Sequence, residues 1–331
     1  MLDDYAFNLR LFFSVDLIGS TAFKARERRN NVSDWARRFR EFFEGFPDHF
    51  KSAYEHLPKL IKPPSNRPRF WKFNGDEILF HVVLTRHEEA AAHVWALIEA
   101  ARSFDSEWSG GSGKSPMPLK LTAWHAGFPV TNAVVRIPGT DDNDKAKYDF
   151  IGPNIDIGFR LTRHADRRWV PLSAGLALML IDWLNRQSQS PVLRMSYRGR
   201  QSLKGVIDDA PHPVFFVDRF KDETPEDKVL PLPEFKPGEA AIFIRQFYED
   251  DHGLQLPFIE GDPDPSFGNI PDKIKKRLDQ IREGIEAEET SRNYAAEGQE
   301  PTARSPRRPS NPMVQMARRP RKGNKKARRS K

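Results

Sequence analysis

Two aspartates and their neighbours are the first candidates for chemistry. Asp16 ends the apolar run LRLFFSVD, and Asp76 follows the turn-forming dipeptide Asn74-Gly75. Adjacent strands would bring both carboxyl groups together, and close carboxylates raise each other's pKa unless a cation lies between them. Carboxylate oxygens suit hard divalent cations, and a pair of ions about 3.5–4 Å apart serves displacement at phosphorus. A metal site is one interpretation, and two solvated strand-end acids are the other.

Three small residues follow Asp16 after two apolar positions. Gly19, Ser20 and Thr21 precede the first expected helix. Backbone N–H groups at the start of a helix favour phosphate, which would make this segment a binding loop. An N-cap formed by Ser20 or Thr21 explains the same residues without any ligand. The sequence leaves both interpretations open.

A sheet has to position these residues. Strands are expected at 9–16, 70–84 (a hairpin), 118–130, 169–173, 195–199 and 214–218, and helices at 22–57, 86–104, from about 154, and at 174–186. The polar segment 131–147 is expected to be a loop. Strands that alternate with helices around a central hairpin predict an α/β domain, of the α+β kind, with one sheet and helices mainly on one face.

Residues 220–331 differ in composition from the first part of the chain. Residues 220–269 are rich in Pro and charge, which predicts an extended segment with one strand-like run at 240–247. Apolar residues recur at helical spacing over 270–289, which predicts one amphipathic helix. We therefore expect a domain at 1–219, a C-terminal extension at 220–290 and a tail at 291–331.

Charge is divided unevenly along the chain. The tail holds 13 Lys and Arg against 2 Glu, net +11, so residues 1–290, with 40 basic and 44 acidic residues, carry −4. A chain segment this polar cannot bury enough apolar surface to fold, and we expect it to be disordered. It would act as a solubilising tail whose contacts with nucleic acid or an acidic surface are weak and salt-sensitive.

Composition excludes several classes of function. The chain has no cysteine, which excludes disulfides, Cys-ligated zinc, iron–sulfur clusters and thiol catalysis. No apolar window of about 18 residues predicts a membrane span, and the N-terminus lacks the order of a signal peptide. A cytoplasmic location is the simplest expectation.

Five blocks together point to a known family. They are FFSVDLIGSTAF (12–23), WKFNGDEILF (71–80), LKLTAWHAG (119–127), YDFIGPNIDIGFRLTRHA (148–165) and RGRQSLKG (198–205). In order and spacing they resemble the catalytic domain of class III nucleotidyl cyclases over residues 9–219. The resemblance implies a ferredoxin-like βαββαβ core with a mixed, mostly antiparallel sheet. It also implies conversion of a nucleoside triphosphate to a 3′,5′-cyclic nucleotide and pyrophosphate.

The resemblance implies a metal site and an assembly. Asp16 and Asp76 match the two aspartates that bind two divalent cations, Mn²⁺ or Mg²⁺. In the family, the metal-binding residues come from one subunit and the other site residues from its partner. This chain carries both sets, so the resemblance implies a homodimer with active sites at the interface.

The resemblance also implies how substrate is held. Lys72 and Asp149 match the pair that reads the base edge, Arg160 the arginine that stabilises the phosphates in the transition state, and Lys204 the lysine that grips the terminal phosphates. Asp156 departs from the family, which usually has an asparagine there to position the ribose. Because it lies four residues before Arg160 on one helix face, we expect the two side chains to touch.

The hydrogen-bond pattern does not choose the base. Lys72 and Asp149 can pair with adenine or cytosine, and with uracil after a shift. Phe70, Trp71 and Phe73, with Phe150, crowd the pair and would favour a single ring, unless they belong to the core. The free-standing domain resembles the pyrimidine cyclases of Pycsar antiphage systems, which favours UTP as substrate. A cytidylate or adenylate cyclase, and an inactive nucleotide-binding module with a nucleic-acid-binding tail, remain the alternatives.

Overall fold

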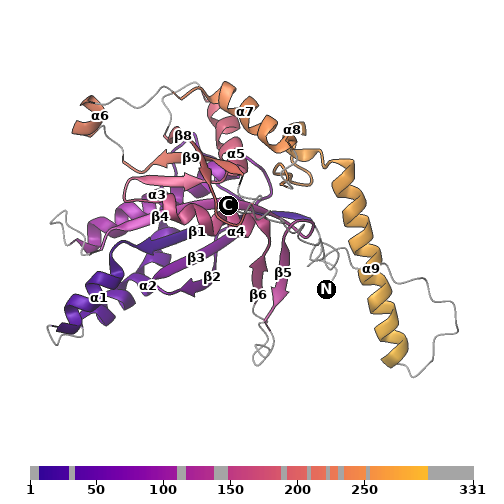
Figure 1. The fold of residues 1–331 in the computed structure, drawn as a ribbon, viewed down its shortest axis with the longest axis horizontal. Coiled ribbons are helices and arrows are strands. Elements are labelled where there is room, and N and C mark those ends of the chain that lie inside the picture. Colours follow the sequence, from indigo (N-terminus) through magenta and orange to yellow (C-terminus); the bar gives the residue numbers. More distant parts are fainter. Residues whose placement is uncertain are drawn as a thin grey trace, which may run out of the picture. The chain divides into compact units, whose positions relative to one another are not determined.

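The computed structural model describes residues 7–29, 34–109, 117–137, 148–187, 192–206, 210–220, 224–229, 235–250 and 254–296. The chain forms one compact unit over Met1–Gln280 and a second over Ile281–Lys331. The sheet and all the site residues discussed below belong to the first unit (Figure 1). Within the described residues, no helix combines the length and the apolar character needed to cross a bilayer. The expectations for the tail beyond residue 296 lie outside the described residues.

The first unit is built on a seven-stranded sheet of order β2-β3-β1-β4-β7-β9-β8. The strands are β1 (Asn8–Leu17), β2 (Arg69–Asn74), β3 (Glu77–Val83), β4 (Leu119–Phe128), β7 (Trp169–Leu172), β8 (Arg194–Ser202) and β9 (Pro211–Asp218). β4 and β7 run parallel, and the other neighbours are antiparallel. The predicted fold class is confirmed, since residues 8–128 give the βαββαβ order with the β2-β3-β1-β4 arrangement of a ferredoxin-like core.

Side-chain alternation along β1 separates the two faces of this sheet. Leu11, Phe13 and Val15 share one core with Phe42 and Phe46, and we call this side the helix face. The helix face is covered by α2 (Asp34–Ala53), which follows α1 (Ser20–Arg29), and by α3 (Glu89–Trp108) and α5 (Ala174–Asn185).

The opposite side, which we call the site face, is covered by fewer elements. Phe12 of β1 packs there with Trp71, Trp124 and Phe150. The covering elements are the hairpin of β5 (Ala133–Arg136) and β6 (Tyr148–Ile151), which stands apart from the main sheet, and α4 (Pro153–Leu161) (Figure 1). Incomplete cover leaves polar residues at the end of this face accessible.

Three local predictions were wrong. The segment 131–147, predicted as a loop, contributes β5. The run 240–247, predicted as a strand, lies in α7 (Pro237–Glu249), because Ile244, Phe247 and Tyr248 form a buried helical stripe rather than an alternating one. The turn between β2 and β3 is centred on Gly75-Asp76, since Asn74 pairs with Glu77 across it.

Residues of the C-terminal extension up to Leu278 pack onto the domain. The extension comprises α6 (Pro225–Val229), α7, α8 (Pro265–Gly268) and α9 (Asp272–Ala296), the last of which was predicted at 270–289. α7 packs on α5 (Figure 1). Phe258, Ile274 and Leu278 form a buried cluster with Phe7, directly before β1.

A buried histidine joins this extension to the helix face. His87 lies between two carboxylates, with Nδ1 2.9 Å from Asp262 and Nε2 2.9 Å from Asp182. Its ring stacks on Phe267 at 4.3 Å. Burial disfavours the charged ring, but the hydrogen bonds to Asp182 and Asp262 outweigh burial and raise the pKa of His87 above its usual value.

We predict that this contact stabilises the protein most below about pH 6, where the charged ring is favoured in the folded and unfolded chains alike. The stabilisation is lost as the pH rises through the raised pKa of His87. Urea unfolding should show His87→Gln less stable than the wild type by about 3 kcal/mol near pH 6, with the difference shrinking toward pH 9. The exposed His56→Gln serves as a control and should leave the profile unchanged. A pH-independent difference would contradict a charged His87.

Candidate functional site

Charged residues gather at one end of the site face. Asp16, near the end of β1, lies opposite Glu77 of β3 and Lys120 of β4. Directly opposed residues share a face, so these side chains project together. Lys120 Nζ lies 2.8 Å from Asp16 Oδ2, and the backbone N–H of Leu17 donates to Asp16 Oδ1 at 2.8 Å.

Hydroxyl groups hold the other two carboxylates. The Ser20 hydroxyl donates to Asp76, and the Ser14 hydroxyl donates to Glu77. Ser20 is buried at the start of α1, after Gly19 with φ +78°, whereas Thr21 is exposed. In this structure Ser20 therefore orients Asp76.

The electrostatics of Asp16 show an excess of negative charge. Burial is the largest cause that raises its pKa, to about 6, and the carboxylates of Asp76 and Glu77 raise it further against the opposing charge of Lys120. Asp76 acts on Asp16 electrostatically, as the sequence predicted for neighbouring carboxyl groups. Three carboxylates and one ammonium make a donor set that fits a hard divalent cation with oxygen ligands.

The second cluster on this face joins β2 to β6. Lys72 Nζ donates to Asp149 Oδ1 at 2.7 Å and to Oδ2 at 2.9 Å. The Trp71 indole N–H and the Phe150 backbone N–H also donate to Oδ1, at 3.0 and 2.9 Å. Burial opposes ionisation of Asp149, but these hydrogen bonds, led by that of Lys72, hold its pKa below its usual value.

A bulge in β2 makes this arrangement possible. Consecutive strand residues normally point to opposite faces, yet Trp71 and Lys72 both reach Asp149. The pairing of β2 with β3 shifts between Phe70 and Lys72, so Trp71 is the extra residue. Its ring lies 4.4 Å from the Lys72 ammonium, where a cation–π contact adds to the hydrogen bonds.

The Lys72–Asp149 pair retains hydrogen-bonding capacity. Asp149 Oδ1 accepts three donors, whereas Oδ2 accepts from Lys72. An ammonium donates three bonds and a carboxylate oxygen accepts more than one, so among the described residues Nζ keeps one donor and Oδ2 keeps room for a second bond. The pair can therefore recognise a ligand edge that offers an acceptor beside a donor.

α4 and the loop after β8 supply the third group of predicted residues. Arg160 Nε donates to the backbone carbonyl of Lys204 at 3.0 Å. Asp156 and Lys204 are exposed. The expected contact between Asp156 and Arg160 was wrong: no ion pair joins them among the described residues, because Arg160 turns toward the loop after β8. The negative charge of Asp156 is thus not offset by Arg160.

A glycine fixes the position of α4. A Cβ on Gly158 would lie 2.1 Å from the Trp124 ring, well inside van der Waals contact. The α4 backbone therefore packs directly on β4, with Trp124 wholly buried beneath it. Because α4 carries Asp156 and Arg160, this close approach sets where both residues stand on the site face.

Two contributors were not predicted. Lys120 contacts Asp16, and Glu77 lies opposite Asp16 in the β1–β3 ladder, although sequence reasoning gave neither of them a role there. Trp71, which was predicted to crowd the Lys72–Asp149 pair, donates a hydrogen bond to Asp149. Even-numbered positions of β1 face the site, so the residue opposite Asp16 could be found once β4 is known to neighbour β1. The sequence alone does not give that register.

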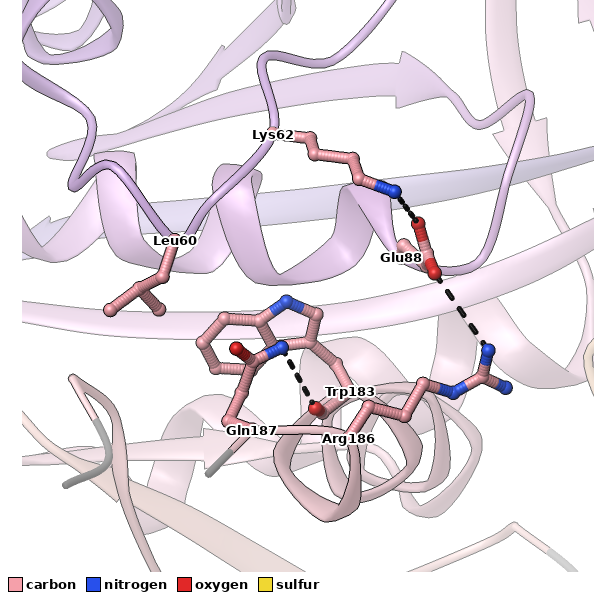
Figure 2. Close-up of a pocket in the computed structure, with 6 residues that line it drawn as sticks. All are labelled: Leu60, Lys62, Glu88, Trp183, Arg186 and Gln187. Atoms are coloured by element: carbon pink, nitrogen blue, oxygen red, sulfur yellow. Dashed lines mark hydrogen bonds and ion pairs between the residues drawn. The ribbon is translucent and has the colours of Figure 1, made fainter. Parts of the chain in front are cut away.

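A separate pocket of about 200 Å³, lined by both apolar and charged side chains, lies on the helix face. Figure 2 shows Lys62 and Arg186 on either side of Glu88, with Leu60, Trp183 and Gln187 completing the wall. Nearby, His87, Asp182 and Asp264 have the spacing of a metal cluster. Arg186 contacts both Asp182 and Asp264, however, and so offsets part of their charge without a metal ion.

Comparisons with known proteins give structural likeness and little else. No family model matches the chain, and no curated protein matches it. The adenylyl cyclase CyaB from P. aeruginosa aligns over 66% of this chain and 96% of its own, with 14% identity and a TM-score of 0.47. The guanylyl cyclase Cya2 aligns over 64% and 91%, with 15% identity and a TM-score of 0.42.

A third solved structure is the guanylate cyclase domain of RhGC from Catenaria anguillulae in complex with GTP. It aligns over 64% of this chain and 96% of its own, with 12% identity and a TM-score of 0.41. Values this low carry no argument about activity. A functional conclusion has to come from the side chains of this chain.

We predict that Gly158→Ala destabilises the protein by about 1–3 kcal/mol, because the added methyl group forces α4 away from Trp124. Urea unfolding with tryptophan fluorescence measures the loss. Gly238→Ala is the matched control: a Cβ there, in the first turn of α7, meets nothing within 4 Å. The control should be neutral or slightly stabilising. Equal stability of the two variants would contradict the close packing of α4.

Proposed function

We propose that this chain is a metal-dependent nucleotidyl cyclase that converts UTP to cyclic UMP and pyrophosphate. The observation that carries the proposal is the pairing of two clusters on one sheet face. A carboxylate cluster around Asp16 and Asp76 suits divalent cations, and the Lys72–Asp149 pair suits the edge of a base. The five blocks that resemble class III cyclases contain all four of these residues.

The carboxylates would hold the cations. Asp16 and Asp76 are the proposed ligands of two divalent ions, Mn²⁺ or Mg²⁺, and Ser20 orients Asp76 for that role. When bound, the ions would lower the pKa of the substrate 3′-hydroxyl and balance charge on the phosphates. Everything else in the reaction is positioning and charge stabilisation by protein groups.

Two cationic residues would hold the phosphates. Arg160 donates one N–H to the Lys204 carbonyl, which leaves the rest of its guanidinium for a phosphate oxygen. The exposed Lys204 side chain would contact the terminal phosphates. Asp156 opposes this role with its charge, and its repulsion of a triphosphate would lower the rate rather than abolish it.

We propose that the active site forms between two copies of the chain. Ile151 and Tyr148 of β6 are 53% and 42% exposed, on the strand that carries Asp149. Large exposed apolar residues beside a site are typical of an interface. A homodimer would cover them and bring the carboxylates of one copy opposite Lys72, Asp149, Arg160 and Lys204 of the other.

The Lys72–Asp149 pair does not by itself select the base. The remaining acceptor and donor of the Lys72–Asp149 pair match adenine or cytosine directly, and uracil after a shift. Trp71 and Phe150 are 9% and 5% exposed and pack against Phe12, so they support the pair from within the core. The preference for UTP, and a role in antiphage defence, rest on the resemblance of the block Trp71–Glu77 to Pycsar cyclases.

We predict that the full chain with Mn²⁺ converts a ribonucleoside triphosphate to its cyclic product. Asp16→Asn should lower the rate about 10²–10³-fold, because a charge partner of the transition state is lost. Incubation with each of the four triphosphates, followed by mass spectrometry of the products, measures both. Asp48→Asn, at an exposed position on α2, is the control and should keep full activity.

The same assay discriminates between the alternatives. Cyclic UMP as the main product supports the UTP assignment, whereas cyclic CMP or cyclic AMP as the main product contradicts it. Nucleotide binding without any cyclic product would identify an inactive binding module. Loss of all nucleotide binding on truncation at residue 290 would instead favour a function of the basic tail.

A further inference from the structure

We propose that Lys120 is a built-in cation that competes with divalent metal ions for Asp16 and so sets how weakly the nucleotide-free protein binds them. The inference rests on the proposed function and adds a residue that the resemblance does not assign. Lys120 Nζ lies 2.8 Å from Asp16 Oδ2, and the side chains are 28% and 19% exposed. An ammonium thus occupies the same carboxylate that a cation would need.

The fold holds this ion pair in place. Asp16 and Lys120 are directly opposite each other in the β1–β4 ladder. Their strand neighbours Leu17, Leu119 and Leu121 are buried in the core of the helix face, so neither backbone can move away. The lysine side chain alone is free to rearrange, and its partial exposure gives the ammonium a path into water.

The bonding of Asp16 makes the competition direct. Its Oδ1 accepts the N–H of Leu17 and its Oδ2 contacts Lys120, so each oxygen already has a partner. Asp76 differs, because its partner is the neutral hydroxyl of Ser20. Among the described residues, an incoming cation therefore meets no competing charge at Asp76, but it has to displace an ammonium at Asp16.

The charges around Asp16 show why removing Lys120 should strengthen cation binding. Asp76 and Glu77 are the anions that act on Asp16, and Lys120 is the cation that opposes them. With the lysine present, these groups sum to about −2, which one divalent ion neutralises. Without it they sum to about −3, which favours cation binding more strongly. A triphosphate that arrives with its ions would offer the displaced ammonium an anionic partner.

The test measures Mn²⁺ affinity of the full-length protein without nucleotide, by electron paramagnetic resonance of free Mn²⁺. Lys120→Met keeps the length of the side chain and removes its charge, and it should bind Mn²⁺ about tenfold more tightly than the wild type, equivalent to 1.4 kcal/mol. Lys120→Arg keeps the charge and should stay within about twofold of the wild type. Lys59→Met, at an exposed position outside the site, should change nothing.

An affinity of Lys120→Met equal to that of the wild type would overturn the inference, because a purely structural ion pair would change stability and leave metal affinity alone. If Lys120→Met fails to fold, the inference can still be tested on the wild-type protein. Mg²⁺ titration should then shift the ¹⁵Nζ resonance of Lys120 as the ammonium leaves Asp16. Mg²⁺ binding without that shift would overturn the inference.

Asp16→Asn separates this inference from the proposed function. If Asp16→Asn weakens Mn²⁺ binding while Lys120→Met has no effect, the competition is wrong and the proposed metal site stands. If Asp16→Asn binds Mn²⁺ as well as the wild type and no triphosphate is converted, the proposed function fails and the inference with it.

Discussion

The alternation of side chains along β1 is the constraint on which the rest of the structure depends. β1 is a central strand covered on both faces, so its odd-numbered residues complete the helical core while its even-numbered residues line the site face. Those even positions change from Phe12 to Ser14 to Asp16 within one strand. A shift of one residue in pairing would turn Asp16 toward the apolar core of the helix face and Phe13 toward the site face. The packing of the core and the placement of the site residues therefore depend on the same register of β1.

Hydrogen bonds and ion pairs between neighbouring elements hold the charged groups on the site face in place. Each carboxylate has a donor on a neighbouring element: Lys120 for Asp16, Ser20 for Asp76 and Lys72 for Asp149. Groups held before a ligand arrives need little reorganisation when it binds. A lysine that is already paired with a carboxylate also competes with a cation that would bind there. Low reorganisation and competition are therefore two results of the same pairing.

Patterns local to a segment were predictable from the sequence, and contacts between distant segments were not. The apolar run before Asp16 identified β1, and the Asn-Gly signal identified the β2–β3 hairpin, although its turn lies one residue further on. α7 was predicted as a strand because its short apolar run shows no clear helical spacing in the sequence. The helical spacing becomes apparent only from the residues that α7 buries. Lys120 was missed since its role depends on which strand lies beside β1. The missing contact of Asp156 depends on the direction of the Arg160 side chain, which helix spacing does not fix.

The cluster of Phe7 with Phe258, Ile274 and Leu278 bears on how the polypeptide matures during translation. β1 is synthesised first, yet the apolar residue that precedes it finds its partners only after some 270 further residues have left the ribosome. A nascent chain halted before that point would carry a nearly complete sheet with one end uncovered. Premature termination before Leu278 should thus yield aggregation-prone fragments rather than smaller working proteins.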